Sequence, residues 1–211
     1  MIELWHCADA RSFRPLWALE ELGLDYKLHL LPFPPRIREP EYLKVNPLGT
    51  IPALRDGPTF MTESAAITQY LVTRHGPSDL AVAPEDPEYG AWLNWLHHGE
   101  ATLTFPQTLV LRYRQLEPGR AEHVADDYAK WFISRLRYAA SVLAERDYLV
   151  CGRFTAADIS VGYALLLAHQ LKLNDRFSPA VLAYWERLKA RPGFQAAKRA
   201  QKTDLSGALS T

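Results

Sequence analysis

The chain contains 211 residues, of which 48% are hydrophobic and 23% are charged, so it is long enough to bury one or two globular cores. Lys and Arg together number 24, as do Asp and Glu, which leaves no net charge to attract nucleic acid or an anionic membrane. The sequence has no signal-peptide pattern and no apolar run near the roughly 20 residues of a bilayer span, so we expect a cytoplasmic protein without membrane or nucleic-acid partners.

The beginning of the chain predicts a strand, a helix and a second strand. Residues 1–5 are a short, mostly apolar run typical of a strand, and residues 26–31 alternate before a proline-rich break. Between them, Ser12 is a candidate N-cap and Pro15 falls in the first helical turn, where a missing N–H costs least. Gly23 is typical of a helix end. Together these segments predict a β-α-β unit.

Turn signals divide the region up to Gly76 into shorter elements. Asn46-Pro47-Leu48-Gly49 predicts a turn, and Asp56-Gly57 is a typical hairpin dipeptide. The elements expected around these turns are a short helix, two strands and a longer helix, at residues 41–45, 51–55, 59–61 and from Ser64 to just before Gly76. The first half is therefore predicted as β-α-β-α-β-β-α.

Proline, serine and acidic residues without periodicity mark a linker at residues 79–86. Beyond the linker every strong pattern is helical. The expected helices cover approximately residues 88–115, 120–146, 156–171, 179–190 and 194–202, followed by a frayed tail from Thr203. We therefore predict an α/β domain at residues 1–78 and an all-α domain at residues 87–211.

Several blocks of residues stand at the joints between these elements. They are Arg11-Ser12 with Trp17-Ala18-Leu19-Glu20-Glu21-Leu22-Gly23, Asn46-Pro47-Leu48-Gly49-Thr50-Ile51-Pro52-Ala53-Leu54, Glu63-Ser64-Ala65-Ala66-Ile67, Gly152-Arg153-Phe154-Thr155-Ala156-Ala157-Asp158-Ile159-Ser160 and Arg191-Pro192-Gly193-Phe194. With these blocks in this order, the chain resembles the glutathione transferase family over nearly its whole length.

The resemblance implies a thioredoxin-like N-terminal domain that binds glutathione and an all-helical C-terminal domain that holds an apolar co-substrate. It also implies a cytoplasmic homodimer that conjugates glutathione to a small hydrophobic electrophile in detoxification. Glutathione would be a co-substrate, with no further cofactor. A non-catalytic relative that keeps the fold for binding or protein interaction is the alternative from a different class.

Glu63 and Ser64 stand at the start of a predicted helix, where unpaired N–H groups and the helix dipole favour an anion. The dipeptide alone is also typical of an N-cap with an acidic neighbour. By the resemblance, Ser64 and its amide hold the α-carboxylate of the γ-glutamyl group of glutathione, and Glu63 assists with the ammonium group.

Ile51 and Pro52 are the second part of the expected glutathione site. An ordinary trans bond at a strand start is possible from the residues alone. The resemblance implies a cis bond before Pro52, so that the backbone of Ile51 pairs with the cysteinyl part of glutathione like an added strand. Thr50 joins this set, although many relatives have a Lys or Gln near here to meet the glycyl carboxylate, and Thr50 offers no charge.

The thiol-activating group is expected in the first loop, where relatives often have Ser-Arg-Ser. Here Ala10 replaces the first Ser, so Ser12 is our first candidate for the hydroxyl donor, with Arg11 as an electrostatic helper. The alternative is that Ser12 is only an N-cap and Arg11 only a solvated charge. Cys7 could instead form a mixed disulfide with glutathione in thiol reductase chemistry, or be a buried inert thiol.

The second half contributes an electrophile pocket and a folding motif. By the resemblance, we expect Thr102, Phe105, Pro106 and Tyr113 to line the hydrophobic pocket. Thr155-Ala156-Ala157-Asp158 has the spacing of a capping box, which predicts a structural role. The adjacent His97-His98 pair is a weak metal motif, because neighbouring helical residues point about 100° apart, and we expect no metal.

Overall fold

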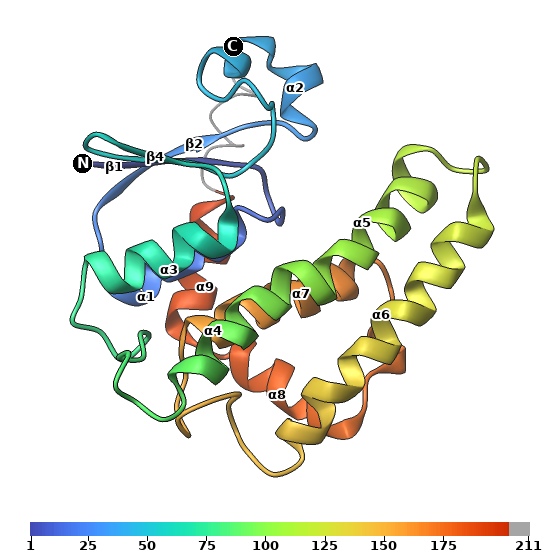
Figure 1. Ribbon diagram of the computed structural model, residues 1–211. Helices are drawn as coiled ribbons and strands as arrows, with labels where there is room; N and C mark the ends of the chain where they lie inside the picture. The colour runs from blue at the N-terminus through green and yellow to red at the C-terminus, as the bar shows by residue number, and fades with distance from the viewer. Residues whose placement is uncertain (203–211) are drawn as a thin grey trace. The chain divides into compact units, whose positions relative to one another are not determined.

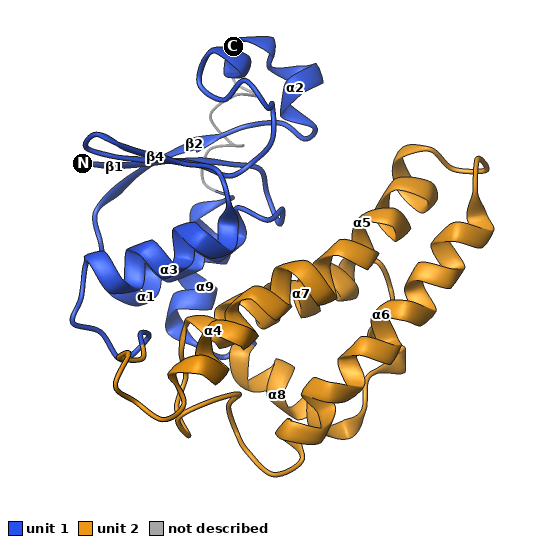
Figure 2. Cartoon of the chain, in the orientation of Figure 1, with its two compact units in different colours: residues 1–81, 189–211 blue, residues 82–188 orange. Residues whose placement is uncertain are grey.

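The computed structural model describes residues 1–202 (Figure 1). These residues form two compact units, coloured separately in Figure 2. The first unit joins residues 1–81 to the described part of the segment that starts at Lys189, and the second is Val82–Leu188. The frayed tail that we expected from Thr203 lies outside the described residues.

The first unit contains a mixed four-stranded sheet in the order β2-β1-β3-β4. The strands are β1, Ile2–His6; β2, Tyr26–Leu30; β3, Ala53–Asp56; and β4, Thr59–Met61. Strand β1 is parallel to β2 and antiparallel to β3, which places Leu4 opposite Leu28 on one side and Leu54 on the other. Because Leu4 and Leu54 are fully buried, the centre of the sheet belongs to the core of this unit.

Two helices, α1 (Phe13–Leu22) and α3 (Ser64–Arg74), pack against each other and lie below the sheet in Figure 1. Gly23 ends α1 with a φ of 62°, as the sequence predicts. Helix α2 (Pro35–Arg38) is followed by a 3₁₀ helix at Pro40–Lys44. We expected only a proline-rich break where α2 begins, but proline is tolerated at the first helical position, where no N–H donor is needed.

The last helix, α9 (Pro192–Ala200), packs against α1 and belongs to the first unit. Its Phe194 ring lies with its centroid 5.0 Å from that of Trp17 and 5.3 Å from that of Phe13, in edge-to-face contact. We expected this helix in an all-α domain at residues 87–211. It belongs instead to the compact unit of the sheet, because it packs against α1. Contacts between aromatic rings that are far apart in sequence hold α9 in the first unit.

Polar contacts to Glu21 hold the start of α9 on α1. The guanidinium of Arg191 donates two hydrogen bonds of 2.8 Å to the two carboxylate oxygens of Glu21, and the indole N–H of Trp17 donates a third, of 2.9 Å. A Cβ atom at Gly193 would lie 2.5 Å from the Glu21 Cδ, so any larger residue there would push this carboxylate away from its present position. These contacts explain the Arg191-Pro192-Gly193-Phe194 block.

The regular secondary structure of the second unit is helical, with no strand among its described residues. Its helices are α4, Tyr89–His98; α5, Phe105–Leu111; α6, Glu122–Leu143; α7, Ala156–Gln170; and α8, Pro179–Lys189, with π-helical turns at Gly99–Thr104 and Arg112–Leu116 and a 3₁₀ turn at Asn174–Arg176. The predicted helix at residues 88–115 is thus present with two π-helical turns. Residues 156–168 of α7 are all buried, so this helix forms the core of the unit. Within residues 1–202, we find no helix with both the length and the apolar character of a membrane span.

The predicted capping box at the start of α7 is present. Asp158 accepts a hydrogen bond of 2.8 Å from the backbone N–H of Thr155, and it also accepts bonds from the Leu149 N–H at 3.1 Å and the Tyr184 hydroxyl at 2.8 Å. Burial raises the pKa of Asp158 to about 6, and the hydrogen bonds oppose this rise. The block therefore connects a helix start to a loop and to α8.

Candidate functional site

The N-terminus of α3 combines a buried hydroxyl with a buried positive charge. Ser64 is the first residue of α3 and is 3% exposed, while Arg14 on α1 is fully buried. The Arg14 Nη1 donates a hydrogen bond of 3.0 Å to the Ser64 Oγ. Glu63 precedes the helix with an extended backbone and is exposed to solvent. The N–H groups of the first turn, the Ser64 hydroxyl and the guanidinium together favour a carboxylate.

Sequence reasoning named Ser64 and Glu63 but missed Arg14. A signal was available, because Arg14 stands between Phe13 and Pro15 in the predicted apolar stretch of α1, where a charged side chain is unusual. A charge at such a position needs a polar partner when the helix packs. The Ser64 hydroxyl is such a partner.

The Ile51-Pro52 peptide bond is cis, as the resemblance implied. The loop before it is fixed by side chains: the Thr50 carbonyl accepts hydrogen bonds of 2.7 Å from both the Tyr42 hydroxyl and the Asn46 amide. Thr50 itself is exposed, whereas Ile51 is only 9% exposed. The loop is therefore held in one conformation beside the sheet, and it brings no formal charge of its own at Thr50.

Ser12 is at the N-cap position of α1, but its side chain makes no capping hydrogen bond. The expectation of a side-chain cap was wrong, because the hydroxyl turns to the end of β1 instead. Its Oγ lies 2.7 Å from the His6 Nδ1 and accepts a hydrogen bond of 3.2 Å from the Cys7 N–H. Ser12 is fully buried, whereas Arg11 and Ala10 are half-buried.

Cys7 lies in the core and not on the surface of this loop. Its side chain is fully buried, and the thiol donates a weak hydrogen bond of 3.7 Å to the Pro32 carbonyl. Burial raises the pKa of the Cys7 thiol to about 12. Since the thiolate is the reactive form of cysteine, a protonated thiol in this position is inert at neutral pH. The geometry supports the buried, inert alternative for Cys7.

The residues expected in the hydrophobic pocket are distributed over one helical stretch. Thr102 is half-buried in a π-helical turn, Phe105 is 51% exposed at the start of α5, and Pro106 is buried. Tyr113 borders a cavity of about 390 Å³ whose other lining residues are Arg114, Pro118, Glu122 and Asp126. This cavity is lined mainly by charged side chains, so the pocket residues remain a prediction.

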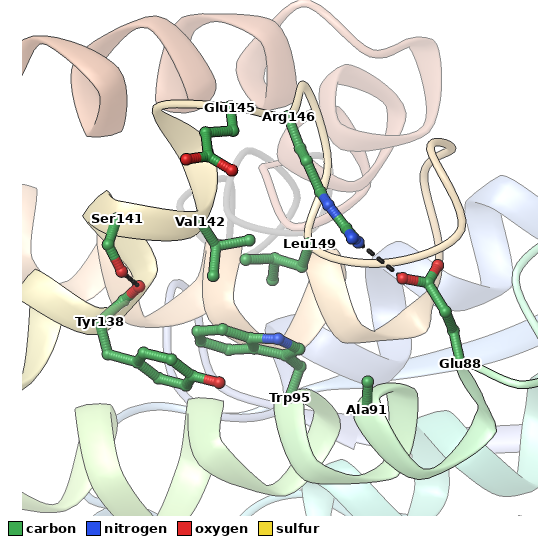
Figure 3. Close-up of a pocket in the computed structure, with 9 residues that line it drawn as sticks. All are labelled: Glu88, Ala91, Trp95, Tyr138, Ser141, Val142, Glu145, Arg146 and Leu149. Atoms are coloured by element: carbon green, nitrogen blue, oxygen red, sulfur yellow. Dashed lines mark hydrogen bonds and ion pairs between the residues drawn. The ribbon is translucent and has the colours of Figure 1, made fainter.

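A second cavity, of about 440 Å³, lies within the helical unit. Figure 3 shows its lining residues, which are Glu88, Ala91, Trp95, Tyr138, Ser141, Val142, Glu145, Arg146 and Leu149. The Trp95 and Tyr138 rings stack with centroids 4.7 Å apart, and the Arg146 Nη1 lies 2.6 Å from a carboxylate oxygen of Glu88. No residue that sequence reasoning assigned to a site lines this cavity.

Comparison with known proteins agrees with the fold that the two units define, an α/β unit and an all-helical unit. A family model described as glutathione S-transferase, N-terminal domain, matches residues 10–74. Glutathione S-transferase 3 of Zea mays is 30% identical over 188 residues, covering 84% of this chain and 83% of that protein. Glutathione S-transferase 3 of Schizosaccharomyces pombe is 29% identical over 192 residues, covering 83% of this chain and 78% of its own.

Solved structures give the same result. A glutathione transferase from Methylococcus capsulatus has a TM-score of 0.86 at 28% identity, covering 96% of this chain and all of that chain. A glutathione transferase from Phanerochaete chrysosporium, in complex with oxidized glutathione, has a TM-score of 0.84 at 28% identity and covers 96% of each chain. The chain belongs to the glutathione S-transferase family. The expected fold class is confirmed, and the reductase and non-catalytic alternatives are not favoured.

Proposed function

We propose that this chain is an enzyme that binds glutathione in its first unit, lowers the pKa of the bound thiol, and directs the thiolate at a small hydrophobic electrophile. The observation that carries this proposal is the buried Arg14–Ser64 pair at the N-terminus of α3. A built anion site of this kind, in a member of this family, fits the carboxylate of the γ-glutamyl group.

The arrangement of donors around Ser64 supports its role. Because the Ser64 Oγ accepts a hydrogen bond from the Arg14 Nη1, the hydroxyl hydrogen can point away from the guanidinium toward a bound carboxylate. The positive charge of Arg14 strengthens that donor in a buried setting. Glu63 is exposed beside it and can meet the ammonium group of the same ligand. The backbone of Ile51, before the cis bond to Pro52, would hold the cysteinyl part, with Thr50 next to it.

Thiol activation was expected from Ser12 with help from Arg11. The Ser12 hydroxyl is fully buried and contacts His6, and Ala10 supplies no hydroxyl at the position of the usual first Ser. We therefore assign the lowering of the thiol pKa to the positive end of α1 and to the half-buried Arg11, and we assign to Ser12 the shape of the loop.

Substrate, assembly and compartment complete the proposal. We propose a cytoplasmic homodimer with glutathione as co-substrate and an electrophile held near Thr102, Phe105, Pro106 and Tyr113. The free state of both cysteines, Cys7 and Cys151, is compatible with a reducing compartment. Sedimentation at micromolar concentration tests the dimer, because a monomer there would contradict it. Phe105→Ala should raise KM for the electrophile without changing KM for glutathione.

The central test measures binding and turnover separately. Calorimetric titration with glutathione should show binding to the wild type and weaker binding to Ser64→Ala. Thr73→Ala is the matched control, because it removes an exposed hydroxyl near the other end of α3. The rate of conjugation of an aromatic halide should fall in Arg11→Gln. The same assay is run on Ser12→Ala for comparison. A wild type that does not bind glutathione would contradict the proposed function.

A further inference from the structure

A chain of hydrogen bonds joins the residue after α9 to the loop after β1. Gln201 is 3% exposed and fully buried His6 lies beside it. The Gln201 Oε1 lies 3.1 Å from the Asp9 backbone N and 3.0 Å from the His6 Nε2. The Gln201 Nε2 and the Lys198 Nζ each donate a hydrogen bond of 2.6 Å to the Asp9 Oδ1. Residues near opposite ends of the chain thus share one network, which is buried at His6 and Gln201 and partly exposed at Asp9 and Lys198.

The network determines which group donates and which accepts in each hydrogen bond. A backbone N–H can only donate and a carboxylate can only accept, so Asp9 orients the Gln201 amide with its oxygen toward the Asp9 N–H. The same oxygen faces the His6 Nε2, which must therefore carry a hydrogen and donate it. Burial lowers the pKa of His6 to about 4, so the ring is neutral near pH 7 and its Nδ1 is an acceptor. The hydrogen bond of 2.7 Å at Nδ1 is then donated by Ser12.

These donor and acceptor roles explain how the loop after β1 is held in place. The Ser12 hydroxyl donates to His6 and accepts from the Cys7 N–H, so it ties the start of α1 to the end of β1. Asp9 adopts a φ of 54°, which is uncommon for a residue other than glycine. The backbone N–H of Asp9 donates to the Gln201 amide oxygen, and the Asp9 carboxylate accepts from the Gln201 amide nitrogen. Gln201 therefore holds this residue of the loop at two points.

We propose that Gln201 is a positioning residue for thiol activation: through His6 and Asp9 it holds the loop that carries Arg11 in its active conformation. This inference rests on the proposed function, since it assigns thiol activation to that loop and to the start of α1. An amide is required at this position, because only a side chain with one donor and one acceptor satisfies both the carboxylate and the N–H of Asp9. Loss of the amide should therefore lower kcat more than glutathione affinity.

Two substitutions separate this role from packing. Gln201→Met keeps the length of the side chain and removes both polar atoms. Gln201→Glu keeps the acceptor for His6 but places a carboxylate against the Asp9 carboxylate and favours the protonated imidazolium of His6. The matched control is Gln195→Ala in α9, where the Gln195 side chain is exposed and donates to the Lys189 carbonyl.

The experiment measures kcat, KM for glutathione, the pH profile of kcat with an aromatic halide, glutathione affinity by calorimetry, and the melting temperature. We expect Gln201→Met to lower kcat roughly tenfold or more, since small misplacements of catalytic groups have such effects. Its pH profile should move to higher pH, because the thiol pKa rises, while glutathione affinity changes less than about twofold. Gln195→Ala should match the wild type in every measurement.

Nitrogen chemical shifts of His6 provide a readout that does not depend on turnover. The wild type should show the neutral ring with hydrogen on Nε2, and Gln201→Glu should raise the pKa of His6. A Gln201→Met variant that melts at a lower temperature but keeps the wild-type kcat and pH profile would overturn the inference. If Gln201→Met does not fold, the same comparison is made with Gln201→Glu. A wild type without glutathione binding would instead contradict the proposed function.

Discussion

The Arg14 guanidinium lies 3.0 Å from the Ser64 hydroxyl oxygen, and both side chains are buried at the N-terminus of α3. The pair joins helices α1 and α3 through two residues that are 50 positions apart in sequence. It gives the proposed carboxylate site a positive charge that solvent does not screen, and hydrogen bonds to charged groups are stronger than those between neutral groups.

Replacement of Arg14 should therefore weaken glutathione binding, because the γ-glutamyl carboxylate of the ligand would lose the effect of this charge. We expect Arg14→Met to reduce glutathione affinity by roughly ten- to a hundredfold, the range for a lost charged hydrogen bond. An analogue whose γ-glutamyl carboxylate is an amide should bind the variant and the wild type about equally. Calorimetry with both ligands checks this, with the exposed Arg74→Met at the end of α3 as control. An equal loss for both ligands would mean that Arg14 acts only on folding.

The buried His6 should make the protein less stable in acid. Its folded pKa is about 4 against an ordinary value of 6.5, so the unfolded chain binds more protons between these values. Stability should therefore rise from pH 4 to pH 6.5, by on the order of 3 kcal/mol from this group alone. The groups that face His6 are Ser12 and Gln201, with Asp9 and Lys198 next to them.

Chemical denaturation of the wild type and His6→Gln across this pH range measures the effect. The substitution keeps a side-chain N–H donor and does not titrate, so the rise in unfolding free energy should be smaller in the variant. Asp158 contributes with the opposite sign, because its raised pKa of about 6 makes stability fall as the pH rises from about 4 to 6. Identical pH dependence in the wild type and His6→Gln would refute the assignment.

The capping box at α7 should affect stability without affecting glutathione. Thr155→Ala should cost about 1 kcal/mol, as for other lost caps. Asp158→Ala should cost about 3 kcal/mol, because it leaves the Leu149 N–H and the Tyr184 hydroxyl without their buried acceptor. Urea denaturation gives both values, and calorimetry at a temperature where each variant is folded gives the affinity. A changed affinity in a fully folded variant would contradict this structural role.

The Cys7 thiol should be unreactive in the folded protein. Burial raises its pKa to about 12, so iodoacetamide should modify it roughly a hundredfold more slowly than in the unfolded chain. Mass spectrometry after timed alkylation identifies the modified cysteine, and the half-buried Cys151 is the internal comparison. Cys7→Ala should keep full conjugation activity. Rapid labelling of Cys7 in the native state would reopen the reductase alternative.

Local sequence signals predicted the parts of the fold that depend on neighbouring residues. Gly23 ends α1, the capping box starts α7, and the order of strands and helices follows from turns and periodicity. The cis bond before Pro52 came from the resemblance and not from the residues themselves. The helix end, the capping box and the turns each lie within a few positions of the signal that predicted them.

The features that sequence reasoning missed depend on distant contacts. His6 and Gln201 are 195 residues apart, and no periodicity or motif connects them. Ser12 has the right identity and position for a side-chain cap, yet its hydroxyl contacts His6, six residues earlier, and the other ring nitrogen of His6 contacts the distant Gln201. Arg14 was overlooked for the same reason: its partner Ser64 becomes a neighbour only when α1 and α3 pack.

The place of α9 in the first unit has a consequence for synthesis on the ribosome. Arg191 reaches Glu21 across 170 residues of intervening chain, and Phe194 covers Trp17. The emerging N-terminal residues therefore cannot complete their core until α9 has left the exit tunnel, and until then the apolar surface of α1 is available to chaperones. A fragment ending at Ala81 would keep the strands of the unit but lose Phe194, which covers Trp17, and Gln201, one of the two side-chain partners of His6.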